Sequence, residues 1–287
     1  MMKTARKPTF LLLLVTVLIV ALVAILMSAA LRPQIVNPHE GQVIVYDGID
    51  WIWMTPLEGV EANTIKKADI AWDGSVPSYI SDEYDVLRGI DVSEHQNEID
   101  WKKVAADGID FAFIRCGYRG NSKGALVEDK YFRDNMQGAL DAGLKVGVYF
   151  YSQAINVQEA IEEADYVLSL IRSYDVTMPV AFDWENESTE WRTAGLRTDV
   201  LSDCAVAFCE TVKQSGYTPA IYFYRRTGYY GLDLTRMTDY VAWFALPESP
   251  FPNFYYKVDI WQYSWTESID GIEGGTDMNL MFLPKSA

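Results

Sequence analysis

Short apolar runs alternate with amphipathic segments along most of the chain. Eight runs have strand character and span 88–92, 111–116, 146–151, 180–184, 220–224, 240–245, 258–262 and 276–279. Helical patterns lie between the early runs, at about 98–107, 131–142, 157–172 and 197–215. Strands that alternate with helices predict a mostly parallel sheet. The eight strands therefore predict a compact β/α barrel whose later helices are shortened or lost.

The N-terminal part of the chain has a different pattern. Residues 10–31 are apolar and uncharged, and a run of this length is enough to span a bilayer as a helix. Lys3, Arg6 and Lys7 precede the run, and a cationic flank of this kind stays on the cytoplasmic side. We therefore expect a cytoplasmic tail at 1–9, a transmembrane signal anchor at 10–31 and an extracellular remainder, in a single-pass protein of the cell membrane.

A cleaved signal peptide is the competing interpretation of this N-terminus. Ser28-Ala29-Ala30 resembles a cleavage site, and cleavage there would give a secreted protein. The apolar run is longer than the usual core of a signal peptide, which favours the anchor.

Residues 32–85 separate the expected anchor from the barrel. Pro33, Pro38, Gly41 and Pro56 interrupt any long helix. The stretch 43–53 reads as two strands around an Asp-Gly turn, which predicts a β-hairpin. We interpret 32–85 as an extracellular linker with a small β element and 86–287 as the main domain. The sequence indicates no role for this linker.

Composition excludes several classes of site. The formal net charge of −16 argues against nucleic acid as a partner, because phosphate binding needs clustered Lys and Arg. Cys116, Cys204 and Cys209 do not form a disulfide framework. With only His39 and His95 in the chain, no His/Cys zinc cluster is apparent, and we expect no metal or cofactor. No protein partner can be identified from the sequence.

Acidic residues mark the candidate chemistry. Asp183 and Glu185 end the fourth apolar run with a spacing of two, so their side chains point to the same side of a strand. Two crowded carboxyls have pKa values that are pushed apart, which suits acid–base chemistry at a sugar acetal. Asp91 ends the first run and Asp277 lies in the last. Because the first and last strands of a closed barrel are neighbours, we expect all four acids to converge at one end.

These motifs resemble glycoside hydrolase family 25, the Chalaropsis-type lysozymes. The motifs that carry the resemblance are Gly89-Ile90-Asp91-Val92-Ser93, Phe111-Ala112-Phe113-Ile114-Arg115, Gly147-Val148-Tyr149-Phe150-Tyr151, Asp183-Trp184-Glu185, Ala220-Ile221-Tyr222, Trp261-Gln262-Tyr263 and Gly275-Thr276-Asp277-Met278-Asn279. Their order and spacing cover about 88–282. The resemblance implies a flattened β/α barrel that cleaves the β-1,4 bond from N-acetylmuramic acid to N-acetylglucosamine in peptidoglycan.

The resemblance also implies roles for the four acids. Glu185 would be the general acid that protonates the leaving oxygen. Asp183 would stay ionised and either orient the 2-acetamido group or help to activate water. Asp91 and Asp277 would tune the other two through charge and hydrogen bonds. Strand spacing leaves retention and inversion open, and a route through attack by the acetamido group is an exception to the two-carboxylate scheme.

Aromatic residues near strand ends are candidates for sugar contacts. We expect Tyr151 and Tyr222 near the substrate, Trp261 and Gln262 lining the cleft, and Tyr118 as a further contact. Arg115 is a buried-strand cation that needs a carboxylate partner. His95 is expected to be a structural hydrogen-bonding residue beside Asp91.

Two alternatives and two departures from the family pattern remain. The main alternative is a catalytically weak glycan-binding or scaffolding module on the same fold, although such a module has no need of a desolvated acid pair. A second alternative is the hydrolysis of chitin-like polymers, which keeps the chemistry and changes the sugar.

The sequence departs from the family pattern at two places. Cys116 stands where a small or hydroxylated residue is expected, which would alter the floor of the cleft, and Trp243-Phe244-Ala245 is an unusual version of its strand.

Overall fold

The computed structural model describes residues 7–30, 37–185 and 188–285. The chain divides into two compact units, Met1–Gln42 and Val43–Ala287. The first unit contains the helix α1 (Lys7–Ala30), whose described side chains, at 12–27, are exposed. Among the described residues, no helix meets the length and apolarity required to cross a membrane. The first six residues of the expected tail and residue 31 of the expected anchor lie outside the described residues.

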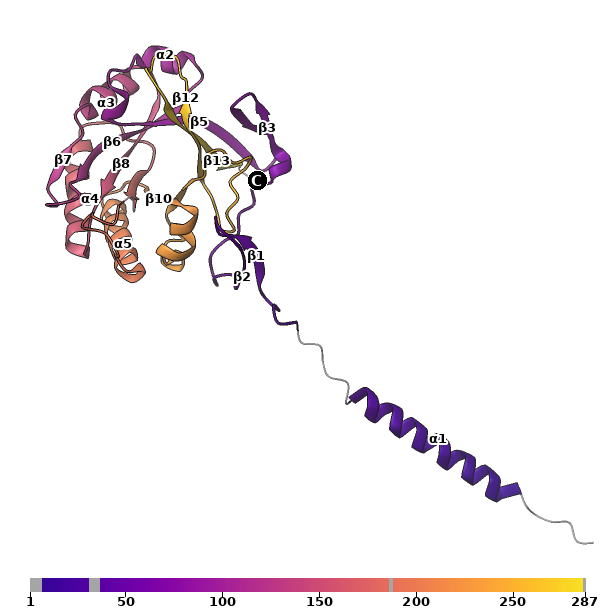
Figure 1. Ribbon diagram of the computed structural model, residues 1–287. Helices are drawn as coiled ribbons and strands as arrows, with labels where there is room; N and C mark the ends of the chain where they lie inside the picture. The colour runs from indigo at the N-terminus through magenta and orange to yellow at the C-terminus, as the bar shows by residue number, and fades with distance from the viewer. Residues whose placement is uncertain (1–6, 31–36, 186–187, 286–287) are drawn as a thin grey trace, which may run out of the picture. The chain divides into compact units, whose positions relative to one another are not determined.

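Eight strands of the second unit close into a barrel (Figure 1). They are β5 (Tyr84–Val92), β6 (Phe111–Arg119), β8 (Lys145–Ser152), β9 (Val180–Trp184), β10 (Pro219–Tyr224), β11 (Val241–Ala245), β12 (Ile260–Glu267) and β13 (Thr276–Pro284). Each strand pairs with the next one in this order, and β13 pairs with β5 to complete the ring. The predicted barrel of eight strands is therefore confirmed.

The direction of the last strand differs from that of the others. The other seven barrel strands run parallel to one another, whereas β13 is antiparallel to both β12 and β5. The start of β13 consequently lies at the same end of the barrel as the carboxyl ends of the other seven strands. We call this end the mouth. Asp277 is the second residue of β13 and lies opposite Asp91 in the register, so it reaches the mouth from the beginning of a strand.

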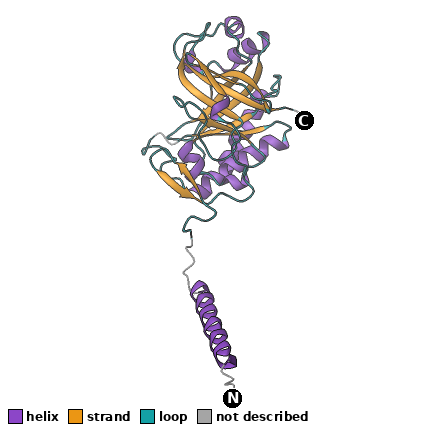
Figure 2. Cartoon of the chain, turned by 90° about the vertical axis from the view of Figure 1, so that its right-hand side faces the viewer, coloured by secondary structure: helices purple, strands orange, loops and turns teal. Residues whose placement is uncertain are grey.

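Four helices follow the early strands, as the sequence predicts. They are α2 (Trp101–Ala106), α3 (Phe132–Asp141), α4 (Val157–Ile171) and α5 (Thr198–Gln214). Asp100 and Asn156 cap α2 and α4, because each side chain accepts a hydrogen bond from a backbone N–H of the first turn. Figure 2 shows the helices around the strands.

The remaining described elements of the barrel are short. After β10 there is a single π-helical turn at Thr227–Gly231 and a 3-10 turn at Leu234–Arg236. A 3-10 turn also lies at Glu94–Gln96. The sequence analysis did not identify β7 (Leu126–Glu128), which adds to the edge of β6 in the antiparallel direction.

Residues 43–85 contain two hairpins. The predicted one is formed by β1 (Val43–Tyr46) and β2 (Trp51–Met54). The second, β3 (Ile70–Asp73) and β4 (Val76–Tyr79), was not predicted, and a 3-10 turn at Lys67–Asp69 precedes it. This segment packs on the barrel. Asn63 donates to the carbonyls of Pro252 and Phe254, and Ala62 bridges to Tyr256.

The second hairpin covers part of the outer barrel wall. The ring of Trp72 meets the rings of Trp261 and Tyr263 edge to face, at centroid distances of 6.1 Å for each pair. Both partners belong to β12, which no long helix follows among the described residues. The hairpin therefore buries an aromatic surface that a longer β/α unit would cover with its own helix.

The inside of the barrel is closed by aromatic side chains. Phe113 stacks on Trp243 with 4.4 Å between ring centroids, and Phe111 packs against Phe113. A Cβ at position 89 would come within 2.3 Å of the Phe111 ring, so glycine is required there. Trp243 thus fills the barrel below the mouth, which gives the unusual Trp-Phe-Ala strand a packing role.

Candidate active site

A cavity of about 530 Å³ opens at the mouth of the barrel. All four acids predicted from the sequence line it: Asp91, Asp183, Glu185 and Asp277. They come from β5, the end of β9 and the start of β13. The fold therefore brings together carboxyls that are up to 186 positions apart in the sequence (91 to 277).

Strand alternation sets the direction of Asp183 and Glu185. Phe182 and Trp184 point to the other face of β9 and are buried in the core between the barrel and its helices. Asp183 is only 4% exposed, and its Oδ1 has no hydrogen-bond partner among the described residues. Glu185 Oε2 accepts a short hydrogen bond from the hydroxyl of Tyr224.

Burial raises the pKa of Asp183 well above its usual range. The negative charges of Glu185 and Asp91 raise it further, and so does a hydrogen bond to Glu185. Asp183 therefore favours the protonated form when the cavity holds no substrate. The expectation that Asp183 is ionised during catalysis therefore requires that substrate lower this pKa, and it stays a prediction.

Asp91 and Asp277 share a network of amides. Asp91 Oδ2 accepts hydrogen bonds of 2.8 Å from both Gln262 Nε2 and Asn279 Nδ2. Gln262 Nε2 also lies 3.3 Å from Asp277 Oδ2. The indole of Trp243 donates to Asn279 Oδ1 at 2.7 Å, which fixes the amide in the orientation that presents its NH₂ group to Asp91. The network therefore holds Asp91 as the acceptor.

The two carboxyls of this network have raised pKa values. Burial raises the pKa of Asp277 to about 9, and the charge of Asp91 adds to this shift. Burial also raises the pKa of Asp91, but the hydrogen bonds from Asn279 and Gln262 hold it lower, at about 6. Asp277 therefore carries a proton at neutral pH and donates it to Asp91 in a hydrogen bond.

Three of the five predicted sugar-contact residues line the cavity: Tyr151, Tyr222 and Gln262. The Tyr222 hydroxyl donates to Gln262 Oε1 at 2.8 Å. This bond orients the Gln262 amide so that its NH₂ group faces the two aspartates. Tyr222 is thus connected to the acid network through Gln262.

Trp261 and Tyr118 lie elsewhere, and their expected positions are corrected. Trp261 alternates with Gln262 along β12, so it points to the outer wall, where it is fully buried and donates to the carbonyl of Leu246. The ring of Tyr118 lies over the guanidinium of Arg115, 5.4 Å away, and does not line the cavity.

Other expectations concerned neighbours of the acids. Arg115 lines the cavity and has its carboxylate partners in Asp129, at 2.8 Å, and Glu94, at 3.0 Å. His95 also lines the cavity. Cys116 does not affect the cavity floor, because it lies at a register irregularity of β6 and packs into the core outside the barrel.

Three aromatic residues of the cavity were not among the sequence candidates: Tyr224, Trp265 and Trp191. Tyr224 follows Tyr222 by two positions on the same strand face, so strand alternation alone was a usable signal. Trp265 donates to Gln262 Oε1 at 2.9 Å from the irregular part of β12. Trp191 comes from the loop after β9, and no local pattern marks it.

No metal site is evident in this cavity. Among the residues that the structure describes, no group of three or more His, Cys, Asp or Glu is arranged to hold a metal ion.

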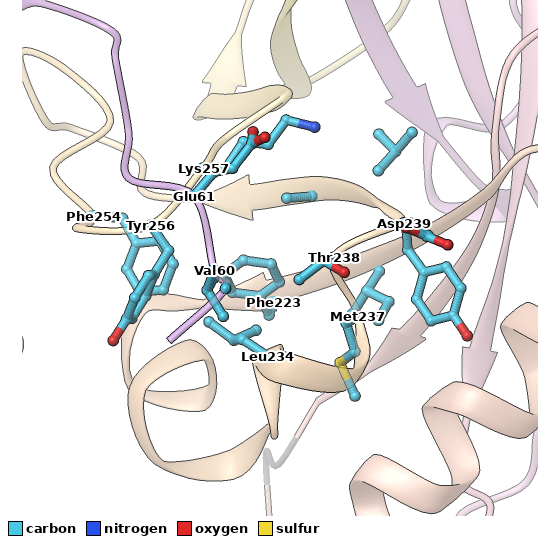
Figure 3. Close-up of a pocket in the computed structure, with 15 residues that line it drawn as sticks. Val60, Glu61, Phe223, Leu234, Met237, Thr238, Asp239, Phe254, Tyr256 and Lys257 are labelled. Carbon is cyan, nitrogen blue, oxygen red and sulfur yellow. The ribbon is translucent and has the colours of Figure 1, made fainter. Parts of the chain in front are cut away.

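A second cavity, of about 300 Å³, lies beside β10 and β11 (Figure 3). The segment around Val60 and Glu61 forms part of its wall, together with Phe223, Leu234 and Met237. None of the four acids lines it, and Phe223 belongs to the outer face of β10. Residues 59–61 thus form part of the wall of this cavity, which is separate from the acid-lined one.

Comparison with known proteins identifies the same part of the chain. A sequence model described as glycosyl hydrolases family 25 matches residues 90–272. An autolytic lysozyme of Clostridium acetobutylicum is 26% identical over 194 residues, which cover 67% of this chain and 55% of that protein. Lysozyme M1 of Streptomyces globisporus is 26% identical over 202 residues, which cover 67% of each chain.

A solved structure shows a similar fold. The autolysin LytC of Streptococcus pneumoniae, in complex with a synthetic peptidoglycan ligand, superposes with a TM-score of 0.59 at 25% identity. The match covers 71% of this chain and 53% of that one. The chain thus spans about half the length of LytC and of the Clostridium lysozyme.

Proposed function

Because the chain belongs to glycosyl hydrolase family 25, we propose that it hydrolyses the β-1,4 bond between N-acetylmuramic acid and N-acetylglucosamine in peptidoglycan. The observation that carries this proposal is the cavity in which Asp183, Glu185, Asp91 and Asp277 meet between aromatic side chains. A similar protein, LytC, has been solved with a synthetic peptidoglycan ligand, which supports the choice of substrate.

In this proposal Glu185 is the general acid for the leaving oxygen. It stands at the end of β9, less enclosed than Asp183, and Tyr224 orients its carboxyl group. A positioned proton donor of this kind contributes about 10² to 10⁴ in rate. Glu185 and Asp183 share a proton through their hydrogen bond.

Asp183 acts through that shared proton. When the N–H of the substrate's 2-acetamido group donates to Asp183, the ionised form of Asp183 is stabilised and its proton passes to Glu185. The acetamido oxygen attacks C1, the glycosidic C–O bond breaks, and Glu185 gives the proton to the leaving oxygen. Glu185 then takes a proton from the water that opens the cyclic intermediate.

Asp91 and Asp277 act through the negative charge that they share. The proton on Asp277 limits this carboxyl pair to one negative charge at neutral pH. That charge disfavours ionisation of Asp183 before substrate binds, since Asp91 is one of the groups that raise the pKa of Asp183.

The proposed mechanism makes a substrate test decisive. Removing the N-acetyl group from the muramic acid residues leaves an amine, so N–H groups remain but the attacking carbonyl oxygen is lost. Cleavage of de-N-acetylated peptidoglycan should therefore be abolished, as measured by the release of reducing ends. Unchanged rates on this substrate would favour the alternative role, in which Asp183 activates water.

We also propose that the protein is anchored in the cell membrane with its barrel outside. Residues 10–31 are apolar and uncharged, α1 covers most of them, and the described side chains of α1 are exposed. The hydroxyl of Thr16, within this run, donates to the carbonyl of Leu12 at 2.9 Å, so the helix satisfies it internally. A cleaved signal peptide remains the alternative, and the two differ in the N-terminal residue of the mature protein.

The activity is tested by incubating residues 32–287 with purified peptidoglycan and identifying new reducing ends by mass spectrometry. Muramic acid ends that disappear with Glu185→Gln support the proposal. Glucosamine ends would show a different bond specificity. Intact glycan together with retained wall binding would instead identify a glycan-binding or scaffolding module.

A further inference from the structure

The β1–β2 hairpin exposes an apolar face. Ile44 is 52% exposed, Trp51 66%, and Ile49, in the connecting loop, 64%. Ile44 and Trp51 point to the same side, because Ile44 pairs with Trp53 and Tyr46 pairs with Trp51 across the strands. We call Ile44, Ile49 and Trp51 the hairpin face. Clustered exposed apolar side chains of this kind mark interaction surfaces.

The hairpin face is held firmly on the barrel unit. Asp47, at the turn, accepts a hydrogen bond from the hydroxyl of Tyr230 at 2.7 Å and pairs with Arg226 at 3.0 Å. The other carboxylate oxygen of Asp47 accepts two backbone N–H groups of the turn. On the opposite side of the hairpin, Val45 is 7% exposed. The face is therefore a fixed surface of the molecule.

The side chains of the hairpin face and its position in the chain indicate what kind of surface it binds. By the same register Tyr46 and Trp53 lie on this side, and Trp53 is 48% exposed. Exposed isoleucine and tryptophan side chains suit the boundary between lipid headgroups and acyl chains, where Trp and Tyr are enriched. Only residues 31–42 separate α1 from β1, and a chain of that length reaches at most about 40 Å. A surface that holds α1 is therefore within reach of the hairpin face.

We propose that the hairpin face rests on the outer surface of the lipid bilayer in which α1 is anchored. This inference rests on the proposed membrane anchor. It also places the cavity: Arg226, which holds the hairpin, is two residues after Tyr224, which bonds Glu185. Because Arg226 follows the carboxyl end of β10, the hairpin is held at the same end of the barrel as the mouth.

The test uses full-length protein in phosphatidylcholine vesicles, with a fluorophore attached at position 49. The natural cysteines are buried, and burial raises the pKa of their thiols, so an Ile49→Cys variant is labelled selectively. Ile80→Cys is the matched control, because Ile80 is 75% exposed and lies just after β4. Neither position lines the acid-lined cavity, so both labelled proteins should keep their activity on peptidoglycan.

The expected result is loss of most of the emission at position 49, but not at position 80, when the vesicles carry nitroxide-labelled headgroups. If the nitroxide lowers the emission at position 49 by no larger a fraction than at position 80, in protein that floats with the vesicles, the inference is overturned and the anchor is left intact. Shielding of position 49 by added glycan strands in place of lipid would assign the face to the glycan. Quenching between labelled copies without a lipid effect would assign it to a second copy of the chain. Protein that fails to float with the vesicles would contradict both the membrane anchor and the contact between the hairpin face and the bilayer. The activity assay on peptidoglycan tests the proposed hydrolysis separately.

Discussion

At the scale of single residues, the site depends on how burial distributes protons among four carboxyls. Asp183 and Asp277 favour their protonated forms because the barrel removes them from water. Asp91 remains the acceptor because two amides donate to it. The chemical difference between the acids therefore comes from their neighbours, since three of the four are the same residue type.

The raised pKa of Asp277 predicts how stability depends on pH. The folded state holds this proton up to about pH 9, whereas an unfolded Asp releases it near 3.8. The contribution is thus complete below pH 3.8 and is lost as the pH rises towards 9, with a slope of up to about 1.4 kcal/mol per pH unit. Asp277→Asn should reduce the decline of the unfolding free energy between pH 6 and 9 but not remove it, because burial also raises the pKa values of Asp183 and Glu163. Urea denaturation at several pH values measures this.

The window above pH 6 is chosen because the pKa of Asp91 lies at about 6. Below that pH both carboxyls contribute to the slope. A control variant, Asp85→Asn, changes an exposed aspartate and should leave the pH dependence as it is. An unchanged slope in Asp277→Asn would mean that Asp277 is ionised in the folded protein.

Trp191 is predicted to contribute to substrate binding. Its ring lines the cavity 6.5 Å from that of Tyr151, and the loop is fixed by the ion pair of Arg192 with Glu159 at 2.6 Å. Trp191→Ala should raise KM roughly threefold to tenfold with a smaller effect on kcat, since an aromatic contact contributes about 0.5–1.5 kcal/mol. Steady-state kinetics on soluble glycan fragments measure this. A fall in kcat at constant KM would contradict a binding role.

At the scale of elements, the second hairpin replaces a missing helix. Trp72 on β3 covers Trp261 and Tyr263 of β12 and donates to the carbonyl of Pro250 at 3.3 Å. Trp72→Ala should lower the free energy of unfolding by about 1–3 kcal/mol, because it uncovers this aromatic surface while the site remains in place. Thermal or urea denaturation measures the loss.

Ile80→Ala is the matched control for this change. Ile80 is 75% exposed just after β4, so its removal should change the stability by less than about 0.5 kcal/mol. Equal effects of the two substitutions would show that the hairpin does not support the barrel wall.

At the scale of the whole molecule, the proposed anchor and the barrel belong to separate units of the chain. If 10–31 remains attached and embedded, full-length protein should stay in the membrane fraction after a high-salt wash, because salt screens ionic contacts but not apolar ones. A soluble chain that begins near Leu31 would show cleavage instead. Immunoblotting of the fractions and N-terminal sequencing distinguish these outcomes.

The sequence by itself determined the elements of the barrel and nominated the four acids. The alternation of apolar residues in strands, the apolar faces of helices and the glycines at helix ends are local signals. They predicted all eight barrel strands and the four helices that follow the early strands. The i, i+2 spacing of Asp183 and Glu185 is equally local. The family motifs repeat these positions, and the match to residues 90–272 confirms the resemblance.

Only the tertiary structure decided how these parts meet. The antiparallel direction of β13, which pairs Asp277 with Asp91, depends on barrel closure between residues far apart in the chain. The packing of Trp72 and the loop that carries Trp191 follow from contacts that no local period encodes. Burial set the protonation of Asp183 and Asp277, because the cost of a charge depends on all the groups that surround it in space.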